Sequence, residues 1–312
     1  MKSIRSILSI LLAAFLVAAC TPQQATILAN IPAPSETPLP PTVMLQPTTT
    51  PLLTPVVLTA EELMNSPYVL PYSQKTVTLT DGAYTGGSGA DYVEVHLADP
   101  IALGDLNGDK IDDAAVVLAE NTGGSGTFKS LIVILDQNGP IQAGAVQLGD
   151  RNQIKTLGIQ DQRILLDMVV HAPNDPMCCP TQPVKETYTW VKSGIVMTHL
   201  TSQTPDGTAR EIHIENPTEG LEVTGSIPLT GTVTIAPFEN TLAYKLMDVQ
   251  GNILDQGPVV VAAADMGGPG TFDALVDLSK VPAGMPFQLA VFDVSMADGS
   301  TLAMDAVDLI HK

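Results

Sequence analysis

The sequence predicts an all-β protein, with an N-terminal antiparallel β meander and a C-terminal β-sandwich behind an export signal and a linker. Aromatic residues make up only 4% of the chain, whereas Val, Leu, Ile, Thr and Gly are plentiful, which favours an aliphatic core built from sheets. Short runs of alternating apolar and polar residues recur from residue 75 onward, separated by turn signals such as Asn107-Gly108. One short helix is expected over 59–65, because Thr59 and Glu62 have the spacing of a capping box.

Length and charge limit the domain count and the partners. At 312 residues the chain is long enough for two domains of ordinary size behind a targeting segment. The formal net charge is −19, so nucleic acid is not an expected partner, because phosphate binding requires a basic surface. The same acidity suits a soluble extracellular surface or an affinity for divalent cations.

Residues 1–19 have the organisation of a bacterial signal peptide. Lys2 and Arg5 precede a short apolar run, and small residues precede Cys20. The apolar run is shorter than the roughly 20 residues that span a bilayer as a helix. The ending Leu16-Val-Ala-Ala-Cys20 resembles the lipobox of bacterial lipoproteins, which implies acylation of Cys20 by fatty acids such as palmitate. The mature chain would then be anchored at the extracytoplasmic face of the cell membrane. An ordinary secretory signal, leaving a free thiol, is the alternative.

Residues 20–57 are expected to form a disordered linker that begins at the lipid anchor site. They are rich in Pro, Thr, Ser and Gln, and Glu36 is their single charged residue. Such a composition cannot bury a core. At about 3.1 Å per residue in the polyproline conformation, the linker could hold the folded part up to roughly 100 Å from the lipid.

Residues 58–200 are predicted to form a β-rich module of unknown activity, an antiparallel meander arranged as a sandwich or a partly closed barrel. Turn signals such as Asp81-Gly82, Asn138-Gly139 and Gly149-Asp150 separate its apolar segments. The expected strands are 75–80, 92–97, 114–119, 128–135, 143–148, 153–159, 164–170 and 185–191.

An acidic loop in this module has the spacing of a calcium site. The oxygen-bearing side chains are those of Asp105, Asn107, Asp109 and Asp113. Alternate residues of a tight loop can point toward one centre, where Ca²⁺ requires roughly six to eight oxygen ligands. The run resembles the Asp-x-Asn-Gly-Asp loops of FG-GAP and VCBS repeats, and the resemblance implies a further ligand, the carbonyl of Ile111. Lys110 replaces the usual glycine, and the chain has one copy where propellers have several. The alternative is an acidic hairpin loop without metal.

Two Gly-rich loops and a pair of adjacent cysteines are the other candidate sites. The loops 85–89 and 122–126 both read Thr-Gly-Gly-Ser-Gly, and neither has the Lys or the helix start of phosphate sites, so flexible connections are expected. Cys178 and Cys179, outside the cytoplasm, can form a vicinal disulfide. Free or partner-paired thiols, or a metal or redox site with His171, are the alternatives. The stretch that contains these motifs resembles a module of other bacterial exported proteins, which implies no activity.

Residues 208–312 are predicted to form the second sandwich. About 100 residues with seven strands is the size of an immunoglobulin-like domain. The expected strands are 212–217, 227–235, 242–248, 258–263, 271–276, 286–293 and 306–310. The phenylalanines of this half are expected in the core, because they fall at alternating strand positions. These residues are Phe238, Phe272, Phe287 and Phe292.

Short motifs distributed over 210–312 identify a family. They are Ile214-Glu-Asn-Pro217, Gly220-x-x-Val223, Ile227-Pro-Leu-Thr-Gly231, Ala236-Pro-Phe-Glu239, Val249-Gln-Gly251, Gly270-Thr-Phe272, Val291-Phe-Asp-Val-Ser295 and Asp298-Gly299. This pattern resembles the Gmad2 domain, the immunoglobulin-like domain of bacterial spore germination proteins. The resemblance implies a small exported β-sandwich that mediates binding, with no catalytic residues.

The sequence therefore favours a non-catalytic lipoprotein that binds an unidentified protein or glycan of the cell envelope. None of the five histidines lies in a recognisable catalytic motif, and the sequence contains no Gly-x-Ser-x-Gly elbow. An envelope hydrolase, such as a glycosidase with two carboxylates, is the alternative. A germination-related accessory role is implied by the family resemblance alone. Ca²⁺ is the single cofactor considered, and none is required.

Overall fold

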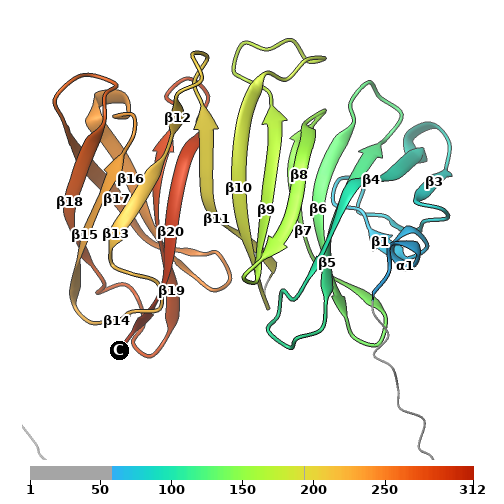
Figure 1. The fold of residues 1–312 in the computed structure, drawn as a ribbon, viewed down its shortest axis with the longest axis horizontal. Coiled ribbons are helices and arrows are strands. Elements are labelled where there is room, and N and C mark those ends of the chain that lie inside the picture. The colour runs from blue at the N-terminus through green and yellow to red at the C-terminus, as the bar shows by residue number, and fades with distance from the viewer. Residues whose placement is uncertain (1–57, 193) are drawn as a thin grey trace, which may run out of the picture. The chain divides into compact units, whose positions relative to one another are not determined.

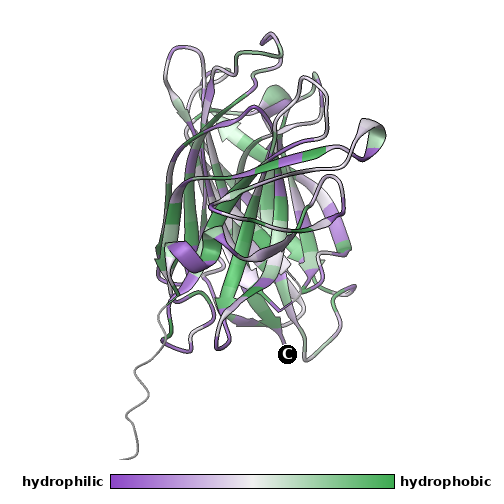
Figure 2. Cartoon of the chain, turned by 90° about the vertical axis from the view of Figure 1, so that its right-hand side faces the viewer, coloured by the Kyte–Doolittle hydropathy of each residue, from purple (hydrophilic) through white to green (hydrophobic). Residues whose placement is uncertain are grey.

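The computed structural model describes residues 58–192 and 194–312 and confirms the all-β prediction. Within these residues α1 (Ala60–Met64) is the single α-helix. The predicted capping box is present, because the Thr59 side chain accepts the Glu62 amide and the Glu62 carboxylate accepts the Thr59 amide. Apolar residues concentrate on the strands (Figure 2), as expected for cores built between sheets.

The N-terminal part contains a five-stranded antiparallel sheet in the order β3-β4-β5-β6-β7. Its core strands are buried on both faces, which explains why 114–118 and 131–135 are continuous apolar runs rather than alternating ones. One face packs against α1 and the β1–β2 hairpin, and the other packs against β8, β9 and β10. The elements are β1 (Pro67–Val69), β2 (Thr76–Thr78), β3 (Ala83–Gly86), the 3-10 helix η1 (Gly89–Asp91), β4 (Val93–Gly104), β5 (Asp113–Asn121), β6 (Phe128–Asp136) and β7 (Pro140–Asp150).

A second antiparallel layer covers this sheet, so the N-terminal part is a sandwich with open sheets rather than a barrel. Its strands are β8 (Gln153–Gln160), β9 (Arg163–Val170), β10 (Gln182–Val191) and β11 (Gly194–Gln203). β11 was not predicted, and neither were the short strands β1 and β3. Through the pairs His199↔Asp305 and Leu200↔Met304, β11 joins β20, so strand pairing continues into the C-terminal part (Figure 1).

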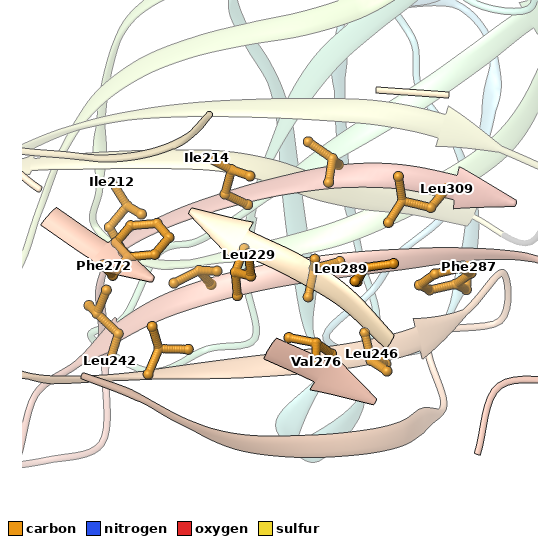
Figure 3. Packing of buried hydrophobic residues seen from close by; sticks show 14 of the residues in the cluster. Ile212, Ile214, Leu229, Leu242, Leu246, Phe272, Val276, Phe287, Leu289 and Leu309 are labelled. Carbon is orange, nitrogen blue, oxygen red and sulfur yellow. The ribbon is translucent and has the colours of Figure 1, made fainter. Parts of the chain in front are cut away.

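The C-terminal part is the predicted immunoglobulin-like sandwich. One layer contains β13, β15 and β18, the other contains β16, β19 and β20, and β17 pairs with strands of both. Between the layers, aliphatic residues such as Leu229, Leu246 and Leu289 form one core, and Phe272 lies beside Ile212 toward one end of it (Figure 3). The elements are β12 (Ala209–Arg210), β13 (Ile212–Asn216), β14 (Glu222–Val223), β15 (Ser226–Val233), the 3-10 helix η2 (Phe238–Asn240), β16 (Thr241–Asp248), β17 (Ile253–Ala263), β18 (Gly270–Asp277), β19 (Pro286–Val294) and β20 (Thr301–His311).

Candidate functional site

Arg151 brings together segments that are far apart in the sequence. It lies between β7 and β8, and its guanidinium pairs with the Asp150 carboxylate at 2.7 Å. The same Nη1 donates to the Met177 carbonyl at 2.6 Å, and Nη2 donates to the Ser125 carbonyl. We call this set of contacts the Arg151 junction. It joins the second Gly-rich loop to the loop that carries Cys178 and Cys179, although the sequence showed no sign of this link.

The Gly-rich loop 122–126 is held at both of its ends. The Asn121 side chain donates to the carbonyls of Gly124 and Gly126 and accepts the amide of Gly123. At the far end, Asp150 accepts the amide of Thr127 at 2.8 Å. The similar loop 85–89 contributes its first residues to β3 and its last to η1. The two loops are thus built differently, and the second one is fixed by side-chain hydrogen bonds.

The structure joins Cys178 and Cys179 by a disulfide. Both residues are exposed, and the preceding Met177 is exposed as well. Asp175 organises the loop, because its carboxylate accepts the amides of Ala172 and Thr181 as well as the Thr181 hydroxyl. These bonds, led by the one from Ala172, lower the pKa of Asp175. The result is an ordered loop with sulfur atoms at its surface.

His171 precedes this loop, and both nitrogens of its half-buried imidazole ring are shielded from solvent. Among the described residues, neither of its ring nitrogens makes a hydrogen bond. Its charge interaction with Asp175 is one of the smaller causes that lower the pKa of that carboxyl group. While both sulfur atoms are in the disulfide, neither can bind a metal as a thiolate. His171 therefore belongs to the setting of the disulfide loop, and the metal site that it would share with the cysteines stays a prediction.

The acidic loop closes on its own backbone amides. The Asp105 carboxylate accepts the amides of Asn107, Gly108 and Lys110. Burial alone would raise the pKa of Asp105, but these bonds together lower it. The side-chain oxygen of Asn107 accepts the backbone amide of Asp109, and the Asp109 carboxylate accepts the backbone amide of Ile111. Lys110 has φ 70°, a conformation in which glycine is favoured.

Asp113 ties the acidic loop to β6. Its two oxygens accept the amides of Leu106 at 2.9 Å and Asp136 at 3.0 Å. Burial raises the pKa of Asp113, although these two hydrogen bonds oppose the shift. Throughout residues 58–192 and 194–312, no three His, Cys, Asp or Glu side chains gather as a metal site. Calcium binding by this loop stays a prediction.

Glu186 is a buried acid that the sequence analysis did not single out. It lies on the core-facing side of β10 and is 8% exposed. Its carboxylate accepts the Tyr188 hydroxyl at 2.5 Å. Burial raises the pKa of Glu186 to about 7, although the bond from Tyr188 opposes this shift. Val184, Glu186 and Tyr188 alternate along β10 and therefore lie on one face of the strand. This alternation is the sequence feature from which the burial of Glu186 could have been predicted.

Thr201, His199 and Asp305 have the order of hydroxyl, imidazole and carboxylate that hydrolases use. His199 Nε2 lies 3.1 Å from Thr201 Oγ1, and His199 Nδ1 lies 3.3 Å from Asp305 Oδ1. Thr201 is nevertheless only 7% exposed and lies near the C-terminal end of β11, paired with Lys185 of β10. In a paired strand the backbone amides already donate hydrogen bonds to the neighbouring strands. The oxyanion that forms during hydrolysis needs donors that are free. The arrangement anchors β11 to β20.

The C-terminal sandwich carries an exposed apolar groove around Phe238. The groove has a volume of about 560 Å³, and we call it the Phe238 groove. Tyr244, Phe292 and Met296 also line it, and Met296 is exposed. The expected core position of Phe238 is wrong, because this residue is 65% exposed. It begins the 3-10 helix η2, in which Glu239 has φ 55°, so the alternation of a strand does not apply.

Comparison with known proteins identifies the C-terminal part. Residues 211–300 match the family model of the immunoglobulin-like domain of bacterial spore germination, Gmad2. The match confirms the resemblance seen in the sequence and indicates a non-catalytic binding or structural module. Among curated proteins, none matches the chain significantly.

The predicted export features fall outside the described residues. Cys20, the signal peptide and the linker belong to 1–57, which the structure does not describe. In the part that it does describe, no helix has the length and apolarity to cross a bilayer. The domain limits 58–200 and 208–312 also stay predictions.

Proposed function

We propose that this chain is a membrane-anchored extracytoplasmic lipoprotein that acts as a non-catalytic binding or structural module of the cell envelope. The match of residues 211–300 to an immunoglobulin-like family is the observation that supports this proposal most. In this proposal acylated Cys20 holds the chain to the bilayer, and the linker 20–57 spaces the folded part from it. The folded part then presents its surfaces to an envelope protein or glycan.

The Phe238 groove is the surface best suited to a partner. Aromatic residues are enriched at binding interfaces, because they bury much area with few torsions. Phe238 and Met296 expose apolar side chains at a groove that Tyr244 and Phe292 also line. Lys245 does not line the groove, but its Nζ lies 4.7 Å from the centroid of the Phe292 ring, so a cation lies next to this surface. Such a mixed aromatic and cationic surface suits a glycan or an acidic peptide.

Catalysis is the less favoured function. Of the described side chains, Thr201, His199 and Asp305 come nearest to a hydrolytic arrangement, and their setting in a paired strand opposes it. Glu186 has the raised pKa of a general acid. However, it lies in the core between two sheets, where a substrate cannot reach it. A germination-related accessory role rests on the family description and is a second proposal of the same binding class.

Cosedimentation with isolated peptidoglycan and crosslinking in intact envelopes test the proposal together. We expect the mature lipoprotein to be retained on peptidoglycan or crosslinked to one envelope protein, and Phe238→Ser to lose that contact. Leu275→Ser is the matched control, because Leu275 is an exposed residue of β18 that does not line the groove. Equal retention of both variants would remove the groove from the proposal. Release of soluble glycan by the wild type would replace binding with hydrolysis.

A further inference from the structure

The disulfide between Cys178 and Cys179 joins neighbouring residues and contributes little to the stability of the fold. A disulfide stabilises a protein mainly by restricting the unfolded chain, and this effect grows with the number of residues that the bond encloses. The bond between Cys178 and Cys179 encloses none. Hydrogen bonds close the loop instead, because the Asp175 carboxylate accepts the amides of Ala172 at 2.8 Å and Thr181 at 2.7 Å. The pair is therefore available for a role other than bridging segments of the chain.

Both cysteines lie at the surface of this loop. Cys178 and Cys179 are exposed, and the side chain of Met177 beside them is 65% exposed. Within 172–182 the single charged residue is Asp175, and amides of the loop itself engage its carboxylate. An incoming thiolate therefore meets little repulsion from the loop. Exposed disulfides belong to the labile, regulatory or catalytic class, whereas structural disulfides resist reduction.

Arg151 fixes the tip of the loop to the sandwich. Its Nη1 donates to the Met177 carbonyl at 2.6 Å and pairs with the Asp150 carboxylate at 2.7 Å. Inside the loop, the Cys179 amide donates to the Pro176 carbonyl at 2.9 Å. None of these contacts uses a sulfur atom, so opening of the disulfide removes none of them. The loop can thus change between disulfide and dithiol while the chain stays folded.

We propose that Cys178 and Cys179 form a thiol–disulfide exchange site for an exported protein that carries a reactive dithiol. Pro176 and Met177, which are both exposed, supply the apolar surface on which this partner docks. The site goes beyond the docking of an envelope macromolecule in the Phe238 groove. It shares no residue with that groove, so either proposal can fail while the other holds.

The exchange transfers electrons from the partner to this chain. One thiolate of the partner attacks the Sγ of Cys178 or Cys179, a mixed disulfide forms as the original S–S bond breaks, and the released sulfur takes up a proton. The second thiol of the partner then displaces the bound cysteine, which takes up a proton in turn. The partner ends as a disulfide and the chain ends with two thiols, so two electrons and two protons have passed to the chain.

A dithiol suits this pair better than a monothiol does. After a monothiol attacks, the freed cysteine lies next to the mixed disulfide, because Cys178 and Cys179 are adjacent. That cysteine attacks the mixed disulfide at high effective concentration, expels the monothiol and restores the original bond. A dithiol holds its own second thiol beside the mixed disulfide and completes the reduction in competition with this reversal. The adjacency of the two cysteines thus favours a protein dithiol as the partner.

Reduction of the purified mature chain by reduced thioredoxin and by glutathione tests the proposal. Thioredoxin is the protein dithiol and glutathione is the monothiol. Alkylation and mass spectrometry of the peptide that contains Cys178 and Cys179 measure the reduced fraction, so the state of Cys20 does not enter the result. We expect thioredoxin to reduce the pair without denaturant, and about 100-fold or more faster per thiol than glutathione does. Equal rates for the two probes, or reduction in denaturant alone, would overturn the proposal.

Met177→Ser tests the docking surface. The variant keeps the backbone carbonyl that Arg151 binds and removes the exposed apolar side chain. We expect reduction by thioredoxin to slow about tenfold and reduction by glutathione to stay unchanged. Met266→Ser is the matched control, because Met266 is fully exposed in the loop between β17 and β18, and it should react as the wild type does. A Met177→Ser variant that thioredoxin reduces at the wild-type rate, or that both probes reduce more slowly, would contradict docking at Met177.

Discussion

Replacement of Glu186 by Gln is expected to stabilise the protein above neutral pH and to leave it unchanged in acid. Glu186 lies between two sheets at 8% exposure, and Tyr188 is its hydrogen-bond partner. Burial raises its pKa from 4.5 to about 7. The folded state therefore binds this proton more tightly than the unfolded chain does, and folding is easier when the carboxyl group is protonated.

The size of the effect follows from the two pKa values. Below pH 4.5 the group is protonated in both states, and no penalty arises. As pH rises from 4.5 through 7, the folded state loses stability, and above 7 the full penalty is present. The difference between 4.5 and about 7 corresponds to about 3 kcal/mol. Glutamine stays neutral at every pH, so Glu186→Gln avoids this loss.

Urea unfolding at pH 4 and pH 8 measures the effect. We expect equal stabilities at pH 4, and at pH 8 a variant that is more stable than the wild type by about 3 kcal/mol. Glu215→Gln, on an exposed position of β13, is the matched control and should differ little from the wild type at either pH. A destabilised Glu186→Gln at pH 8, or a difference that does not change with pH, would refute the reasoning.

Three further predictions concern the N-terminal part. Arg151→Ala should lower the unfolding free energy by about 2 kcal/mol, because it removes a largely buried cation with three acceptors. Amide exchange over 171–181 should then accelerate; unchanged exchange would mean that the Arg151 junction does not order the loop. Cys178 and Cys179 are exposed, so a mild reductant should yield two alkylated thiols without unfolding; alkylation that requires denaturant would contradict this expectation. Calcium at about 100 times its Kd should raise the unfolding free energy by about 2.7 kcal/mol, and Asp109→Ala should abolish that gain. A melting temperature that is the same in EDTA and in calcium would contradict the prediction of a calcium site.

Local sequence patterns correctly predicted those elements whose structure is determined by residues close together in the sequence. The capping box at Thr59 and Glu62 formed as expected. The runs 114–118 and 131–135 became strands, and their continuous apolar character agrees with the cover on both of their faces. The Gmad2 motifs gave the C-terminal fold. Strand β11 escaped prediction because its polar residues, such as His199, are satisfied by contacts with β20, and no local pattern reveals such partners.

Most features of the candidate sites could not be predicted from the sequence, because they depend on contacts between residues that are far apart in it. Arg151 joins Ser125 to Met177 across gaps of 26 residues on each side, and the sequence has no signal for that link. Phe238 follows Pro237 in a 3-10 turn, which overrides the alternation that predicted its burial. Glu186 was accessible to prediction, since strand alternation places it on the core face with Tyr188. We did not expect an acid there, because buried carboxylates are uncommon.

Mass spectrometry of the mature protein, purified from membranes, tests the central claim most directly. We expect a polypeptide that begins at Cys20 and carries covalently bound fatty acids, and a Cys20→Ala variant that leaves the membrane fraction. An unmodified chain that starts at Met1 and is recovered from the cytosol would contradict the lipid anchor, and with it the proposed role in the cell envelope.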